Sequence, residues 1–377
     1  MLKELTIMLI DLIWDLDPVI LTLGSLQLRW FTLFLVVGVL LGRFLFFRNL
    51  EDAKLTAAEG SSIFNYSLLG ALVGSRLFYF LFFEPQTFAS NPLQIVFPFE
   101  WKGGFRFEGA SEFSLTGELI GLLISLFIYS KVKGMLYSIS LNKGLLVFIV
   151  IGIFIGVGNF FQSENYGTPT DAPIGVLFAN RIEKKLMRTS CCVMRIPNGK
   201  NPLDKAIVKA GKVLAHEATG YKPIIIYLFF TEGATEQLVN EFLIGDVKTS
   251  LYELSEVVFE SGDEPLHYNI YEEGKGKYMA RIQSIGIARH PLQLYETLGF
   301  LLVGFGLVSF SKKEKISLAL FLMVAVIAII HFGLGFLATD RGVVIPQLSI
   351  SVDQLTCAAG VLLFVFLGWI SWNKIKA

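Results

Sequence analysis

Residues 143–162 read KGLLVFIVIGIFIGVGNFFQ and carry no charge after Lys143. About 20 mostly apolar residues are enough for a helix to cross the hydrocarbon core of a bilayer. Similar runs occur at about 30–48, 65–83, 113–131, 291–310, 316–338 and 350–370. The sequence therefore predicts an all-α polytopic membrane protein with about seven transmembrane helices.

The overall composition agrees with a membrane protein. Of 377 residues, 53% are hydrophobic and only 17% are charged, whereas soluble domains average about 45–50% apolar and about 25% charged. The formal net charge is +0, which gives no reason to expect a nucleic-acid partner. Because the three cysteines fit no zinc-binding spacing, we expect neither a metal site nor a cofactor.

Lysine and arginine residues gather at alternate loops between the predicted spans. They are Arg43, Arg48, Lys131, Lys133, Lys143, Lys312, Lys313, Lys315, Lys374 and Lys376. Short basic loops face the cytoplasm. This rule predicts a cytoplasmic C-terminus, with the N-terminus and the long loop at about 164–290 on the other side.

The long loop is polar enough to form a folded domain of its own. We divide the chain into an N-terminal interfacial arm (1–29), a membrane part with four spans (30–180), an inserted α+β head (181–288) and a membrane part with three spans (289–377). In and around the head, the pattern predicts strands at 189–196, 222–230, 266–273 and 277–286, and helices at 204–214 and 234–258. The last two strands are joined by a glycine-containing turn, EGKGK.

Two polar clusters flank this loop, and a third lies within the spans. GNFFQSENYGTPT ends the fourth span, RHPLQLYE opens the fifth, and Arg76 and Glu118 lie in the second and third. Polar groups at membrane depth are costly, so they indicate a functional site. The alternative is that they form interhelical hydrogen bonds that only hold the bundle together. So many polar groups at one depth favour a polar cavity.

In both flanking clusters the chain resembles the prolipoprotein diacylglyceryl transferase family. IGVGNFFQSENYG (155–167) is similar to the family pattern G-R-x-G-N-F-x-N-x-E-x-x-G, and the H-P-x-Q-L-Y-E motif is complete at 290–296. GALVGSRLFYFLFF (70–83), LRW (28–30), APIGVLF (172–178) and LSISVDQL (348–355) also resemble family segments. The resemblance covers the membrane part and excludes the head, which looks like an insertion.

The resemblance implies a reaction at the outer face of a bacterial inner membrane. Family members move the diacylglyceryl group of phosphatidylglycerol onto the cysteine thiol of a preprolipoprotein and release glycerol-1-phosphate. It implies that phosphatidylglycerol is bound and that a preprolipoprotein or another membrane protein is a partner. The lipid- and substrate-binding residues predicted from the three polar clusters are Arg76, Asn159, Glu164, Tyr166, Gly167, His290, Gln293, Tyr295 and Glu296.

Several family positions are substituted here. Phe31 replaces a tyrosine, Thr116 the histidine of an S-H-G motif, and Gly156 the arginine of G-R-x-G-N-F. His331 and Gly335 replace the arginine and glutamate of F-R-F-x-x-E-F. Threonine cannot act as a general base near neutral pH, and glycine cannot hold a phosphate.

Two hypotheses follow from these substitutions. In the first, the chain is a working transferase in which His331, Arg106 and Arg341 are the candidate catalytic residues. In the second, it is a non-catalytic relative that binds lipid, lipoprotein or a membrane protein through the cavity and the head. A transporter is less favoured, because the sequence shows no inverted repeat and no pair of broken helices.

Overall fold

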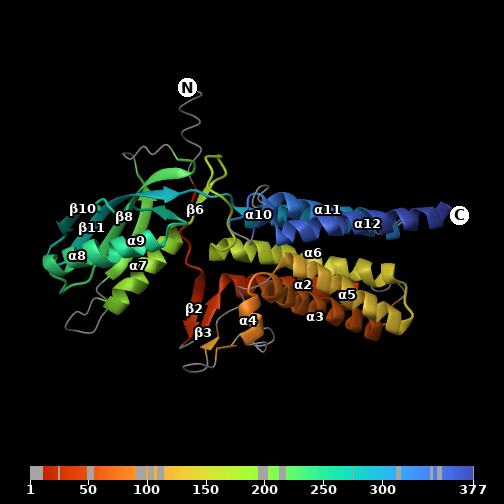
Figure 1. The fold of residues 1–377 in the computed structure, drawn as a ribbon. Helices are drawn as coiled ribbons and strands as arrows, with labels where there is room; N and C mark the ends of the chain where they lie inside the picture. Colours follow the sequence, from red (N-terminus) through yellow and green to blue (C-terminus); the bar gives the residue numbers. More distant parts are fainter. Residues whose placement is uncertain are drawn as a thin grey trace. The chain divides into compact units, whose positions relative to one another are not determined.

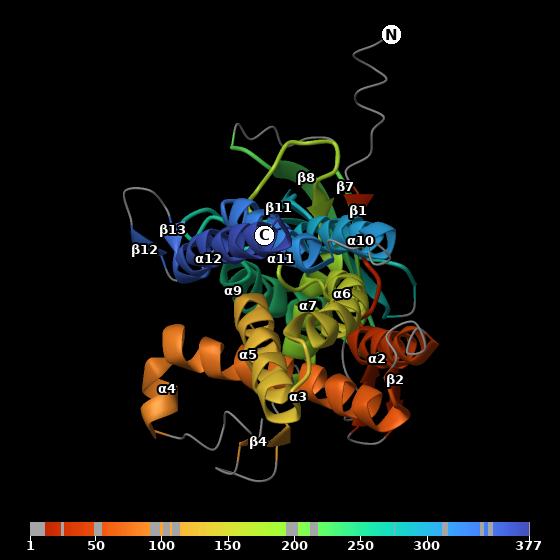
Figure 2. The same cartoon turned by 90° about the vertical axis from the view of Figure 1, so that its right-hand side faces the viewer.

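The computed structural model describes residues 12–23, 26–48, 55–90, 99–100, 106–107, 114–193, 203–211, 218–274, 276–310, 316–339, 343–345 and 350–376. The chain forms two compact units. The helical unit comprises residues 30–159 and 292–377, and the sheet unit comprises residues 1–29 and 160–291. Figures 1 and 2 show their elements along the sequence.

Long helices make up the helical unit. They are α2 (Trp30–Arg48), α3 (Ala57–Phe82), α5 (Leu115–Lys133), α6 (Tyr137–Gln162), α10 (Leu292–Phe310), α11 (Ile316–Gly335) and α12 (Val352–Lys376), with the short α4 (Pro85–Ser90) after α3. Among the described residues, α2, α5, α6 and residues 292–309 of α10 are long and apolar enough to cross a membrane. Shorter apolar stretches occupy 320–335 and 352–366. This is the architecture of a polytopic membrane protein.

The apolar side chains of these helices fall into two groups. Phe46, Leu126, Leu145 and Val324 are fully buried in one core cluster. Others point away from the bundle, as Phe305 does with 77% of its surface exposed. Exposed apolar surface on long apolar helices is suited to contact with lipid tails.

Glycines bring α3 and α5 into backbone contact. A Cβ atom at Gly74 would lie 2.4 Å from the carbonyl oxygen of Gly117, and one at Gly121 would lie 2.1 Å from that of Gly70. Both distances are far inside van der Waals contact, so only glycine fits. Such close approach at small residues is typical of helix packing in membranes.

A five-stranded antiparallel sheet forms the centre of the sheet unit. Its order is β10 (His267–Glu272), β11 (Tyr278–Ile287), β8 (Tyr221–Phe230) and β7 (Leu203–Ala210), and β9 (Val258–Phe259) also pairs with β11. The helical segments α7 (Ala179–Val193), α8 (Glu236–Phe242), η3 (Leu243–Val247) and α9 (Lys248–Glu253) complete the unit. In Figure 1, α7, α8 and α9 lie on one side of the sheet.

Two of the secondary-structure predictions for this region are wrong. Residues 189–193 end helix α7 instead of starting a strand, and residues 204–210 belong to strand β7 instead of a helix. In β7 the side chains of Ala206 and Val208 alternate into the core, while its backbone pairs with β8. The sequence pattern of this segment fits both a helix and a strand, and pairing with the neighbouring strand determines that it is a strand. The strands predicted at 222–230, 266–273 and 277–286 are confirmed, and the stretch predicted as helical at 234–258 is helical over residues 236–253.

Two-stranded ladders connect more distant segments. In the sheet unit, β1 (Leu12–Ile13) pairs in parallel with β6 (Val176–Leu177), and β2 (Val19–Leu23) pairs with β3 (Leu26–Arg29). In the helical unit, β4 (Phe99–Glu100) pairs with β5 (Arg106–Phe107), and β12 (Val343–Ile345) with β13 (Ile350–Ser351). Residues 1–11 of the predicted interfacial arm lie outside the described residues.

Candidate functional site

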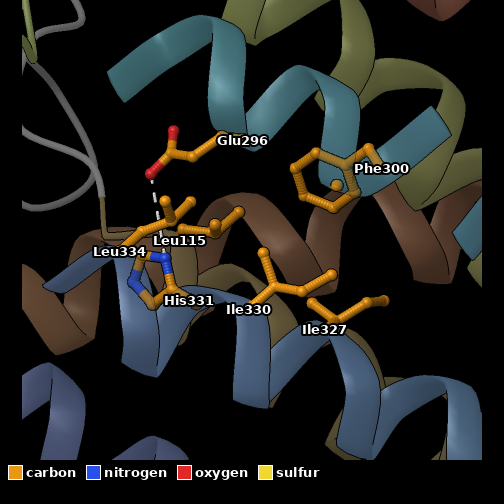
Figure 3. A pocket seen from close by; sticks show the side chains of 8 residues that line it. Leu115, Glu296, Phe300, Ile327, Ile330, His331 and Leu334 are labelled. Atoms are coloured by element: carbon orange, nitrogen blue, oxygen red, sulfur yellow. Dashed lines mark ion pairs between the residues drawn. The ribbon is translucent and has the colours of Figure 1, made fainter. Parts of the chain in front are cut away.

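A buried carboxylate and a buried imidazole face each other across α10 and α11. Oε1 of Glu296 lies 3.8 Å from Nδ1 of His331, and their side chains are 17% and 8% exposed. Figure 3 shows both side chains at a cavity of about 250 Å³, which Leu115, Phe300, Ile327, Ile330 and Leu334 also line. The pair is thus almost the whole polar content of an apolar pocket.

A second cavity, of about 420 Å³, lies among α5, α11 and α12. It shares Leu115, Ile327 and His331 with the first cavity. Its other polar groups are Thr116, Thr356 and Cys357, and the Thr116 hydroxyl lies 4.0 Å from the Cys357 sulfur. His331 therefore borders both cavities, which suits a residue that meets a ligand.

The beginnings of α5 and α12 carry a polar network that sequence reasoning did not select as a site. The Ser114 hydroxyl, which caps α5 by accepting the Gly117 N–H at 3.3 Å, donates to Asp353 at 3.2 Å. Gln354 donates to the Phe332 carbonyl at 3.1 Å and accepts the Ser351 N–H at 2.9 Å. Asp353 and Gln354 lie in LSISVDQL (348–355). The resemblance of this segment to the family was the feature of the sequence that could have marked them as site residues.

At Gly156 and Gly335, the structure brings a neighbouring side chain close. A Cβ atom at Gly156 would lie 2.2 Å from the Thr297 hydroxyl, and one at Gly335 would lie 2.6 Å from Cγ of Gln354. Thr297 and Gln354 therefore occupy the space next to these two glycines.

The remaining predicted residues of the helical unit have different surroundings. Arg76 is buried on α3, with its guanidinium 5.0 Å from the ring centre of Phe80. Gln293 is fully buried, and Asn159 and Tyr295 are partly buried. Arg106 lies in β5, and Arg341 lies outside the described residues.

Four predicted residues belong to the sheet unit: Glu164, Tyr166, Gly167 and His290. The Tyr166 hydroxyl donates to the Glu256 carboxylate and accepts from Arg181 at 2.5 Å. The guanidinium of Arg289 lies 5.2 Å from the centre of the Tyr166 ring, and Phe178 stacks against this ring at 5.3 Å. Because both its hydroxyl and its ring have partners, the Tyr166 side chain stabilises the sheet unit.

The other residues of this cluster also take part in backbone pairing. The Gly167 N–H donates to the His290 carbonyl at 2.8 Å, and the His290 N–H donates to the Thr168 carbonyl at 3.1 Å. Glu164 is partly buried. Burial lowers the pKa of the His290 imidazole and raises the pKa of the Tyr166 phenol. Both groups are therefore neutral at neutral pH.

The fold and the cavities define a class: a polytopic membrane protein with a buried carboxylate–imidazole pair inside its bundle. The family model of prolipoprotein diacylglyceryl transferase matches residues 18–370. The chain belongs to this family, as its motifs indicated.

Individual relatives are similar over a smaller part. The phosphatidylglycerol–prolipoprotein diacylglyceryl transferase of Rickettsia typhi is 31% identical over 169 residues, which are 44% of this chain and 61% of the relative. Enzymes of the same name from Rickettsia bellii and Bordetella avium are 32% identical over 167 residues, covering 44% and 43% of this chain and 59% of each relative. The chain thus spans about three fifths of these relatives.

Proposed function

We propose that the chain is a diacylglyceryl transferase that uses phosphatidylglycerol and a preprolipoprotein, with Glu296 and His331 as its acid–base pair. The observation that carries this proposal is the 3.8 Å approach of these two side chains in a cavity. A carboxylate beside an imidazole orients the ring and stabilises its protonated form, as in other base–orienter pairs. His331 then replaces the base that is missing at Thr116.

The reaction needs one proton transfer and one displacement. The lipobox thiol gives its proton to His331, because the thiolate is the nucleophile. The sulfur attacks the carbon of the diacylated glycerol that is bonded to the phosphate oxygen. A C–S bond forms at this carbon, and its C–O bond to the phosphate breaks. Glycerol-1-phosphate leaves with the electron pair of that bond, and a cation stabilises its charge. Arg76, Arg106 and Arg341 are the candidates for that cation.

The proposal includes a topology. Seven spans, formed by α2, α3, α5, α6, α10, α11 and α12, cross a bacterial inner membrane. The N-terminus and the inserted α+β head lie in the periplasm and the C-terminus lies in the cytoplasm. The length and apolar character of most of these helices, together with the basic loops, support this arrangement.

The activity is tested by complementation of a strain depleted of its own diacylglyceryl transferase, with lipidation of a reporter lipoprotein as the readout. We expect rescue by the wild type, loss with His331→Phe and Glu296→Gln, and retention with Ile330→Val, a change in the same cavity. No rescue by a folded, inserted protein would refute the proposal.

One observation favours a second function. Thr297 and Gln354 fill the space at Gly156 and Gly335, which suits a non-catalytic relative that binds lipid, lipoprotein or a membrane protein. Such a protein would retain phosphatidylglycerol through purification without consuming it. Release of glycerol-1-phosphate by the purified protein, given a lipobox peptide, would exclude this alternative.

A further inference from the structure

The outward face of the sheet differs from the face that packs on the helices. Along β8, Ile224, Ile226 and Leu228 are buried in the core, and the residues between them point the other way. The outward positions hold Asp204, Lys205, Ile207, Lys209, Tyr221, Pro223, Ile225, Tyr227, Phe229, Phe259, His267, Asn269, Tyr271, Met279, Arg281, Gln283 and Ile285. We call this set the outward sheet face.

These side chains do not belong to the unit's core. The core cluster of described residues, with the partly buried residues packed on it, includes none of them. Tyr271 is 44% exposed, and Lys205 and Lys209 are exposed as well. The described helices α7, α8 and α9 lie on the other side of the sheet, where their side chains join the core (Figure 1). Within the described part of the sheet unit, no helix therefore packs on the outward sheet face.

Its chemistry is basic and aromatic. Its basic residues are Lys205, Lys209 and Arg281, and its one acidic residue is Asp204, which is exposed beside Lys205 at the bulge of β7. The register places Arg281 beside Tyr227, and the Lys209 amine lies 5.7 Å from the centre of the Tyr227 ring. Cations interleaved with aromatic rings form a surface that attracts anionic headgroups and enters the interfacial layer of a bilayer.

We propose that the outward sheet face docks on the surface of an anionic phospholipid bilayer. Charge complementarity is the first argument. The second is connectivity: four residues separate Ile287, the end of β11, from Leu292, the start of α10. Four extended residues span at most about 14 Å. Because α10 is long and apolar enough to cross a membrane, the sheet is tethered near lipid at a high effective concentration.

This docking is independent of the transfer chemistry at Glu296 and His331. An acidic polypeptide is the competing occupant, since it would meet the same cations. The tether favours the bilayer, because lipid is always within reach of the sheet and a soluble peptide must be recruited.

The test uses the full chain in proteoliposomes. A fluorophore is attached at Ile207→Cys, in a background whose native cysteines are replaced by alanine, and is quenched by lipids with spin-labelled headgroups. We expect quenching in bilayers that contain phosphatidylglycerol, weaker quenching in pure phosphatidylcholine, and loss at 1 M salt, where the Debye length is about 3 Å.

Charge reversal gives the quantitative test. Each cation near an anionic surface contributes roughly a five-fold change in binding constant. The double variant K205E/K209E should therefore lower the ratio of docked to undocked sheet by at least roughly 25-fold. The matched control is K184E/R188E, which changes the same charge at two exposed positions of α7 and should leave quenching unchanged.

Three results would overturn the proposal: equal quenching in both lipids, an equal effect of the control variant, or protection of the fluorophore by an acidic peptide without contact with the quencher. If K205E/K209E does not fold, the lipid and salt comparisons on the otherwise unchanged chain still decide.

Discussion

Replacing Gly121 by alanine should destabilise the helical unit by separating α3 from α5. The new Cβ atom would lie 2.1 Å from the Gly70 carbonyl oxygen and 2.7 Å from the Gly74 Cα. Ordinary contact begins at 3.4 Å, so the backbone of α3 must retreat by about 1.3 Å (3.4 − 2.1). Both atoms belong to the backbone, and no side-chain rotation relieves the clash.

The expected cost is about 1–3 kcal/mol, the usual range for overpacking. The assay is unfolding of the purified protein by a denaturing detergent, followed by circular dichroism. Gly333→Ala is the matched control, because a Cβ at this position in α11 meets nothing within 4 Å. In the control, alanine should stabilise the helix by about 0.5–1 kcal/mol. Equal stability of the two variants would refute the reasoning from close backbone approach.

Three further predictions concern single side chains. Burial raises the pKa of Glu183 to about 7, above its ordinary value. The free energy of unfolding of the sheet unit, measured by hydrogen exchange at the amides of β7, should therefore fall as the pH rises from about 4.5 to 7. E183Q should abolish this pH dependence. Tyr166→Phe removes the hydroxyl that bonds Glu256 and Arg181 and should cost about 1–3 kcal/mol in denaturant unfolding; an unchanged midpoint would contradict the structural role. Gly335→Ala displaces Gln354 from its bond to a backbone carbonyl, and unfolding by denaturing detergent should show a loss of about 1 kcal/mol.

The sign of the Glu183 prediction follows from proton binding. Between about pH 4.5 and 7 the folded state holds a proton that the unfolded state has lost, so lowering the pH favours folding. Above pH 7 Glu183 is ionised in both states, and the free-energy cost of burying its charged carboxylate destabilises the folded state in full. The hydrogen bond that its Oε1 accepts from the Val208 N–H at 2.9 Å opposes the shift in part.

The two candidate functions make different predictions for the same pair. If Glu296 and His331 perform catalysis, E296Q should reduce lipidation without changing the stability of the purified protein. If they only hold α10 and α11 together, E296Q should lower the stability of the protein, and neither the wild type nor the variant should lipidate the reporter. Measuring lipidation and unfolding on one preparation separates these outcomes.

The sequence by itself determined the membrane class of the protein and its family. Long apolar runs and basic loops need no tertiary contacts to be recognised, because the bilayer imposes their length and charge pattern. Motifs such as HPLQLYE carry the family in the same local way. The head strands at 222–230 and 277–286 were also readable, since one face of each is buried and alternation follows.

Only the tertiary structure decided the rest. Residues 204–210 form strand β7 and not the predicted helix because their backbone pairs with β8, a partner outside the segment, and this pairing outweighs the local preference. The approach of Glu296 to His331 joins residues on different helices, and no spacing in the sequence encodes that distance. The close contact of Gln354 with Gly335 is likewise a consequence of how α11 packs on α12, because a contact between two helices depends on their arrangement and not on either segment alone.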